Sequence, residues 1–205
     1  MMLDPGAFRA VLGRFASGVT VVSTVHGGLD HAMTASAFSS VSMDPPLVAV
    51  FVDRQARFHD AVVASRRWAV SILAESGQDA ATWFAHQGRP ELGQFDQVDH
   101  VRGDATGAPL VRQAIGWLEC LTWAEYDGGD HLILVGEVVA ARVLPDGAVT
   151  DAEGSDRPLL YHRSHYAALL RSLADERSQV ALRAAIIEDG ANEAEHRGSG
   201  ADERG

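Results

Sequence analysis

The 205-residue sequence contains no lysine, so all 17 of its basic residues are arginine. A Walker A loop needs a lysine to reach nucleotide phosphates, and a pyridoxal-phosphate enzyme needs a lysine amine for its Schiff base. P-loop, kinase and pyridoxal-phosphate chemistries are therefore excluded. The sequence also lacks a G-x-G-x-x-G turn after a strand, a G-x-S-x-G elbow and an H-E-x-x-H motif. It thus supports neither a Rossmann site, nor an α/β-hydrolase, nor a zinc protease.

Cys120 is the only cysteine, which excludes an intrachain disulfide and a zinc site built from several thiolates. Residues 117–121 (WLECL) indicate a strand, so we expect a buried, inert thiol. His162 and His165 are three residues apart, but they fall at a predicted strand end without a neighbouring pair of carboxylates. We therefore expect no metal site.

The formal net charge is −11, and acidic residues occur along the whole chain. Nucleic acids and anionic membranes are bound by basic patches, so we expect neither as a partner. No apolar stretch approaches the roughly 20 residues that a membrane-spanning helix needs. The first residues show no basic segment followed by an apolar one, as a signal peptide would. A cytoplasmic location is the expectation.

The length predicts one domain followed by a tail. We place the domain at residues 8–170 and the tail at residues 171–205. Residues 180–187 could form a short helix, whereas residues 189–205 are rich in glycine, alanine and charge and contain no aromatic residue. Such a segment buries too little apolar surface to offset its ordering entropy, so we expect it to be disordered.

Helices are predicted at three places. The first starts at Asp4-Pro5, carries an apolar stripe at Phe8, Val11, Leu12 and Phe15, and ends before Gly18. The others are expected at residues 58–65 and at residues 76–85, where Ser76 would cap the helix with Asp79 three residues later.

Strands outnumber these helices and come in hairpins, which favours an antiparallel sheet or barrel. A turn at Gly27-Gly28 joins the first two, and residues 127–130 (DGGD) have the turn chemistry to join the two longest. We read residues 36–46 as a loop and residues 88–109 as a long excursion with one short strand near Val98. The predicted strands are residues 19–25, 31–36, 47–52, 68–73, 115–126, 131–144 and 158–161.

Several ordered motifs resemble one family. Residues 18–24 read GVTVVST and residues 33–48 read MTASAFSSVSMDPPLV. The shorter motifs WFA (83–85), LEC (118–120), GDH (129–131) and PLLY (158–161) follow in order. Together they resemble the flavin reductase domain family over about residues 8–170. Its members are short NAD(P)H:flavin oxidoreductases, and many are the reductase component of two-component flavin-dependent monooxygenases.

The resemblance implies a mainly β fold, a six-stranded antiparallel split barrel of the FMN-binding type with flanking helices. It also implies a homodimer with the flavin in a groove near the subunit interface, and a separate monooxygenase as partner. The apolar stripe of the first helix agrees with a dimer, because that stripe needs a surface to cover it.

The small, hydroxyl-rich segment after residue 33 matches the family's flavin loop. The flat isoalloxazine ring needs backbone amides and short hydroxyls that allow close approach. By the resemblance, the flavin contacts in this segment are Thr34, Ala35, Ser36, Ser40, Val41 and Ser42. The WFA motif adds Phe84 and Ala85.

The segment that would hold the phosphate of the flavin departs from the family pattern. Many members carry Ser-x-Thr after the strand that ends here near Val52, whereas this chain has Ala56 and Phe58 at those places. Arg54 or Arg57 could instead hold a phosphate by charge-assisted hydrogen bonds, assisted by the N-terminus of the next helix. The choice between FMN and FAD stays open.

His131 matches the histidine of the family's Gly-Asp-His motif, which lies near the nicotinamide. Tyr161 and Tyr166 fall where the family's last strand meets the dinucleotide. The resemblance thus implies hydride transfer from NADH or NADPH to the flavin, with the protein orienting the two rings and supplying no general acid or nucleophile. Alternatives are a split-barrel protein that holds FMN tightly without turnover of free flavin, and a split-barrel oxidase or deazaflavin-dependent reductase.

Overall fold

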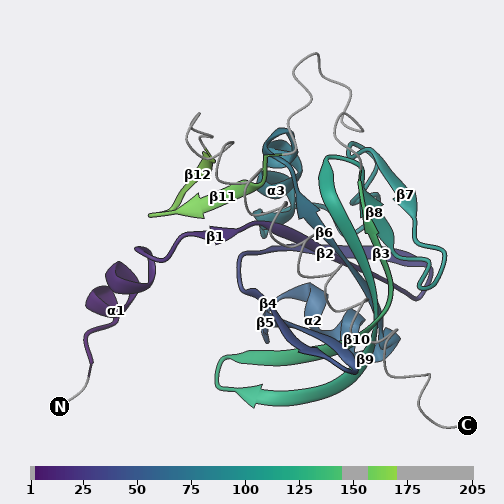
Figure 1. Ribbon diagram of the computed structural model, residues 1–205, viewed down its shortest axis with the longest axis horizontal. Coiled ribbons are helices and arrows are strands. Elements are labelled where there is room, and N and C mark those ends of the chain that lie inside the picture. The colour runs from purple at the N-terminus through teal and green to yellow at the C-terminus, as the bar shows by residue number, and fades with distance from the viewer. Residues whose placement is uncertain (1–2, 145–156, 170–205) are drawn as a thin grey trace, which may run out of the picture. The chain divides into compact units, whose positions relative to one another are not determined.

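The computed structural model describes residues 3–144 and 157–169 (Figure 1). β-Strands dominate them, which confirms the predicted mainly β class. The helical elements are α1 (Pro5–Leu12), α2 (Arg57–Ser65), the 3-10 turn η1 (Glu75–Gly77) and α3 (Gln78–Ala85). The strands are β1 (Ser17–Gly18), β2 (Thr20–His26), β3 (Leu29–Ala35), β4 (Phe38–Met43), β5 (Pro46–Asp53), β6 (Arg67–Leu73), β7 (His100–Arg102), β8 (Pro109–Val111), β9 (Ala114–Gly128), β10 (His131–Val143), β11 (Leu159–His162) and β12 (His165–Ala168). No helix in the described ranges is long and apolar enough to cross a membrane.

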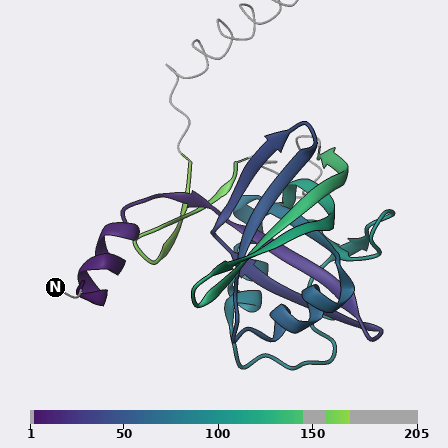
Figure 2. The ribbon, with the colours of Figure 1, turned by 90° about the horizontal axis from the view of Figure 1, so that it is seen from below.

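The largest sheet of the described residues has seven strands in the order β3-β2-β6-β9-β10-β5-β4, all antiparallel. The resemblance implies a barrel of six strands. One of the seven, β4, lies in residues 36–46, which we expected to be a loop. Its small polar side chains have weak strand propensity, but its backbone pairs with the buried strand β5, and this tertiary pairing overrides the propensity. Figure 2 shows the β4–β5 pair in dark blue beside the green end of the β9–β10 hairpin.

The predicted long hairpin is confirmed. His131 pairs with Gly128, so the connection is the two-residue loop Gly129-Asp130. Gly129 has a φ of 78°, a left-handed conformation that glycine adopts without steric cost. The motif DGGD therefore sets the turn and places His131 at the first position of β10.

Other boundaries differ from the prediction. Helix α1 begins as expected, with the Asp4 carboxylate accepting from two backbone amides, but it ends at Leu12, and Gly18 belongs to β1. Helix α3 starts at Gln78, and Ser76 lies in η1 without capping it. The predicted strand near Val98 begins at His100, and β12 was not predicted. The possible helix at 180–187 and the tail lie outside the described residues.

Strand β2 is buried on both faces, as its run of valine and threonine allows. Val22 packs into one apolar cluster and Val21 into another on the opposite face. The first cluster contains Val50, Phe58, Trp68 and Leu134, and the second contains Val19, Leu73, Phe84, Phe95 and Leu159. The second exists because α3 and the segment after it cover that face of the sheet.

The expected excursion, residues 88–109, and the strand β8 at its end are fixed to the main sheet by buried polar side chains. The Ser23 hydroxyl donates to the Pro109 carbonyl oxygen at 2.5 Å, and the Ser71 hydroxyl accepts from the Val111 amide at 3.0 Å. Both serines are almost fully buried. Buried polar groups need such partners, so these two serines specify where the excursion lies.

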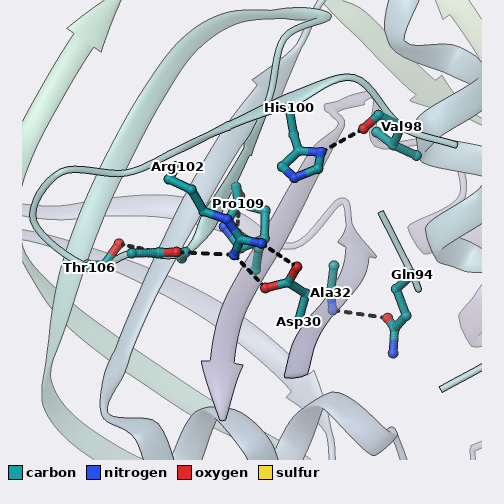
Figure 3. Close-up of polar contacts among 11 residues, drawn as sticks. Asp30, Ala32, Gln94, Val98, His100, Arg102, Thr106 and Pro109 are labelled. Carbon is teal, nitrogen blue, oxygen red and sulfur yellow. Dashed lines mark hydrogen bonds and ion pairs between the residues drawn. The ribbon is translucent and has the colours of Figure 1, made fainter. Parts of the chain in front are cut away.

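A buried carboxylate and an ion pair hold the middle of the same excursion. Glu119 Oε2 accepts from the Ala105 amide at 3.0 Å, and from the amide and the hydroxyl of Thr106, each at 2.7 Å. Arg102 forms a two-pronged ion pair with Asp30 of β3, with N–O distances of 2.6 and 2.7 Å (Figure 3). The excursion is thus tied to both β3 and β9.

Cys120 is fully buried, as expected from the sequence. Burial, and to a lesser extent the Glu119 charge, raises the pKa of its thiol to about 12. The side chain packs in the first cluster beside Trp68, whose indole lies against Gly136 of β10. A Cβ atom at Gly136 would overlap the Trp68 ring and lie 2.9 Å from Cys120 Cβ.

We therefore predict that Gly136→Ala lowers the free energy of unfolding by about 1–3 kcal/mol, because the core cannot take up an added methyl group without strain. Chemical denaturation measures this change. Gly116→Ala is the matched control on the neighbouring strand, where a Cβ would meet its nearest atom at 3.4 Å, an ordinary contact. An equal loss in both variants would show that the Trp68 contact is not the cause.

Candidate functional site

A cavity of about 470 Å³ opens between the ends of β3 and β5, the start of α2 and the end of α3. Its volume falls within the roughly 300–1,000 Å³ typical of small-molecule sites. Residues far apart in the sequence meet there. The lining contains these residues named from the sequence: Thr34, Ala35, Ser36, Arg57, Phe84, Ala85 and His131.

Strand β3 supplies one wall of the cavity. The Thr34 hydroxyl donates to the Ala81 carbonyl oxygen of α3 at 2.6 Å, which fixes this wall against the helix. Ala35 is buried, and Ser36 follows at the end of the strand. The wall is therefore rigid and carries short side chains, so a flat ring can approach its backbone closely.

Ser40, Val41 and Ser42 lie on β4 and do not line this cavity. The pairing of β4 with β5 shifts register between Ser40 and Ser42, and the Val41 side chain is 53% exposed. The structure therefore separates these three residues from Thr34, Ala35 and Ser36.

Phe84 and Ala85 close the cavity at the carboxyl end of α3. Phe84 is buried, and its ring centroid lies 4.7 Å from that of Phe95 in the second cluster. Most of the Phe84 side chain thus packs in the core, while Ala85 is exposed at the rim.

Of the two arginines proposed for a phosphate, only Arg57 lines the cavity. Arg54 is turned to the β9–β10 hairpin, where it forms an ion pair with Asp127 at 2.8 Å and donates to the Gly129 carbonyl oxygen. Arg57 donates to the carbonyl oxygens of Gln87 and Arg89 at 3.4 and 2.7 Å. Its guanidinium therefore stays at the cavity wall.

Arg89 also lines the cavity, and the sequence did not single it out, because it lies in the aperiodic excursion. Its Nη1 donates to the carbonyl oxygens of Phe84 and His86 at 2.8 and 2.9 Å, where α3 ends. Its Nη2 donates to the Ala32 carbonyl oxygen of β3. Burial, and secondarily the Arg57 charge, lowers the pKa of this guanidinium.

Arg57 and Arg89 form no ion pair with a carboxylate of the residues that the structure describes. Within residues 3–144 and 157–169 the arginines that form ion pairs are Arg54, Arg66, Arg102, Arg112 and Arg157. Asp53 lines the cavity too, but it forms no ion pair in the described ranges, and its Oδ1 accepts from the Gln55 amide in the turn before α2. The cavity thus has a cationic end formed by two arginines.

The N-terminus of α2 points to the same end. Its N-cap is Ala56, which offers no side-chain hydrogen bond to the first amides of the helix. Ala56, Arg57 and Phe58 all line the cavity. Uncapped amides at a helix start bind anions, so an anionic group is the natural partner for this end.

His131 also lines the cavity, from the first position of β10, where it pairs with Asp53 of β5. Its Nδ1 lies 2.7 Å from Asp130 Oδ1, which orients the ring. The hydrogen bond from His131, and then its charge, lowers the pKa of the exposed Asp130 carboxyl. Because Nδ1 faces Asp130, Nε2 is the nitrogen left to contact a ligand.

Tyr161 and Tyr166 face each other from β11 and β12, with ring centroids 5.5 Å apart. Tyr161 lines a second cavity of about 690 Å³, which shares Ser36, Ala37 and Phe51 with the first. Tyr166 lines neither cavity. Burial raises the pKa of Tyr166, partly offset by a hydrogen bond with Thr82 of α3.

An antiparallel β-sheet protein with a rigid, small-residue wall and a cationic end in one cavity has the features of a binder of flat, anionic cofactors. The family model described as "Flavin reductase like domain" matches residues 12–170. The chain therefore belongs to the flavin reductase-like family.

Two relatives with assigned functions are similar over most of the domain. An NADH-dependent FAD reductase from Streptomyces globisporus is 46% identical over 143 residues, covering 69% of this chain and 78% of the relative. The reductase subunit HsaB of a flavin-dependent monooxygenase from Mycobacterium tuberculosis is 33% identical over 164 residues, covering 80% and 82%.

Solved structures agree with this assignment. BorF, the flavin reductase component of a bacterial two-component tryptophan halogenase, superposes with a TM-score of 0.74 at 38% identity, covering 82% of this chain and all of BorF. The NADH:FAD oxidoreductase SgcE6 of Streptomyces globisporus, in complex with NAD and FAD fragments, gives a TM-score of 0.73 at 35% identity, covering 84% and 99%.

Proposed function

We propose that this chain is an NAD(P)H-dependent flavin reductase that reduces FMN or FAD and supplies it to a separate monooxygenase. The observation that carries the proposal is the cavity in which Arg57, Arg89 and the uncapped start of α2 face the rigid β3 wall. Relatives named as FAD reductase and as monooxygenase reductase subunit support it.

The residues present fit a flavin. The short side chains of Thr34, Ala35 and Ser36 leave room for the isoalloxazine ring beside the β3 backbone, and Phe84 and Ala85 bound it from α3. Arg57 and Arg89 would hold the phosphate by charge-assisted hydrogen bonds, together with the first amides of α2. These arginines take the place of the Ser-x-Thr hydroxyls that the chain lacks.

The chemistry supplied by the cofactors is hydride transfer from the nicotinamide to the flavin, so the protein's task is to orient the two rings and exclude competing reactions. His131 would bind the carboxamide or a phosphate of the dinucleotide through Nε2. Tyr161 would contact the dinucleotide from the second cavity, which shares the lining residues Ser36 and Ala37 with the first. Tyr166 would position Tyr161 by ring contact.

We further propose that the sheet closes as a split barrel, with Ser40, Val41 and Ser42 reaching the flavin only in the dimeric assembly. Ala35 of the edge strand β3 and Val50 of β5 belong to the same core cluster, which supports closure. The dimer is supported by α1, which buries none of its residues. Its apolar stripe is solvent-exposed in the single chain, with Phe8 50%, Val11 70% and Leu12 55% exposed.

The purified chain should oxidise NADH or NADPH when FMN or FAD is present, because the proposed site binds both reactants. A steady-state assay of both nicotinamides with FMN, FAD and riboflavin measures this activity. Folded protein that oxidises neither nicotinamide with any of the three flavins would sink the proposal. A yellow protein that keeps its flavin through dialysis, without turnover of free flavin, would favour the tight-binding alternative.

His131→Ala should raise the KM for the nicotinamide about tenfold, because it removes one hydrogen bond to the dinucleotide. Flavin affinity should change much less, since the β3 wall and both arginines stay intact. Steady-state kinetics and a flavin titration separate the two effects. His26→Ala, an exposed histidine at the other hairpin turn, is the control. Equal losses for flavin and nicotinamide would place His131 in the fold or the flavin pocket instead.

Light scattering should give twice the 21.9 kDa mass of the chain at micromolar concentration. Phe8→Asp combined with Val11→Asp should shift the protein towards monomer, because a charge in the apolar stripe would be buried at the interface. Ala10→Asp adds the same side chain to the opposite face of α1 and should leave the mass unchanged. A wild-type mass near 21.9 kDa would contradict the dimer.

A further inference from the structure

Gln94 is a buried amide behind the cationic end of the cavity. Its side chain is 3% exposed, and it comes from the excursion between α3 and β7. Its Oε1 accepts from the Ala32 amide of β3 at 3.3 Å (Figure 3). The same oxygen accepts from Arg89 Nε, also at 3.3 Å. Its Nε2 donates to the Glu91 carbonyl oxygen at 3.3 Å. Gln94 itself does not line the cavity, so it acts through Arg89.

Gln94 and Arg89 together complete the edge of the main sheet. Strand β3 is an edge strand, and the outward amide and carbonyl of Ala32 would otherwise lack partners. The Gln94 oxygen accepts from the Ala32 amide, and Arg89 Nη2 donates to the Ala32 carbonyl oxygen. These two side chains make the hydrogen bonds that a neighbouring strand would make. They do so next to Met33 and Thr34 of β3, which line the cavity.

All four acceptors of Arg89 are neutral. They are the carbonyl oxygens of Ala32, Phe84 and His86, and the Gln94 amide oxygen. They engage four of the five guanidinium N–H groups, and the fifth has no partner in the described part of the chain. The side chain is therefore fixed while its positive charge stays uncompensated. A glutamate at position 94 could accept the same two hydrogen bonds from Ala32 and Arg89, but it would lose the donation to the Glu91 carbonyl oxygen and would neutralise the Arg89 charge.

We propose that Gln94 is a positioning residue that fixes Arg89 and, being neutral, reserves its charge for the phosphate of the bound flavin. It thereby makes the site prefer phosphorylated flavins over riboflavin. This inference rests on the proposed function, because it assigns the phosphate to Arg57 and Arg89. It adds a determinant of specificity outside the cavity.

Gln94→Glu in the full chain tests the inference, with FMN and riboflavin as probes that differ only in the phosphate. Binding is followed by quenching of flavin fluorescence at several salt concentrations. FMN affinity should fall about tenfold or more, as expected for losing one charge-assisted interaction, while riboflavin affinity should stay within about twofold. The salt dependence of FMN binding should become shallower, because less positive charge faces the phosphate.

Gln97→Glu is the matched control, since it adds the same charge three residues away at an exposed position outside the cavity. It should leave both affinities unchanged. Equal weakening of FMN and riboflavin by Gln94→Glu, or unchanged FMN binding, would overturn the inference. If Gln94→Glu fails to fold, Gln94→Met removes the hydrogen bonds while staying neutral. It must still reduce the preference for FMN, and an intact preference would overturn the inference.

Failure of this inference can be told from failure of the proposed function. Wild-type protein that reduces flavins but binds riboflavin as tightly as FMN would overturn the role of Gln94 and the assignment of the phosphate to Arg57 and Arg89, and leave the reductase activity standing. Wild-type protein that prefers FMN but oxidises no nicotinamide would overturn the reductase, and leave the phosphate preference standing.

Discussion

The outer edge of β3 at Ala32, which has no partner strand among the described residues, is the point on which the fold and the candidate site both depend. An unpaired strand edge either attracts another strand or must be covered. Here two side chains, from Arg89 and Gln94, cover it. The same arginine also caps the carboxyl end of α3, so the sheet edge, the helix end and the cavity are joined by one guanidinium. The excursion that supplies it is in turn fixed by Ser23, Ser71 and Glu119.

Elements with strong local signals could be predicted from the sequence. The valine- and threonine-rich β2, the glycine turn before His131 and the aspartate cap of α1 each specify their conformation through nearby residues. Strand β4 could not be predicted, because its serines favour a loop and only pairing with β5 makes it a strand. Helix α3 starts at Gln78, two residues later than predicted, because Ser76 belongs to the 3-10 turn η1 that precedes the helix.

The site could be predicted only in part, for a similar reason. The motifs locate the β3 wall and His131, which line one cavity. Arg54 and Arg57 are equivalent in the sequence, and only the three-dimensional structure shows that Arg54 is engaged by Asp127. Arg89 and Gln94 lie in a segment without periodicity, and their importance comes from contacts with Ala32, some 60 residues earlier in the chain. No local pattern carries such information.

The burial of Cys120 has a consequence for how the protein withstands its own proposed product. Free reduced flavin reacts with dioxygen and generates hydrogen peroxide, which oxidises cysteine through the thiolate form. The only thiol of this chain is enclosed beside Trp68, and with a pKa of about 12 it stays protonated near neutrality. Peroxide formed from released flavin therefore meets no accessible thiolate that could attack it, so this route of oxidation is closed to the one cysteine of the sequence.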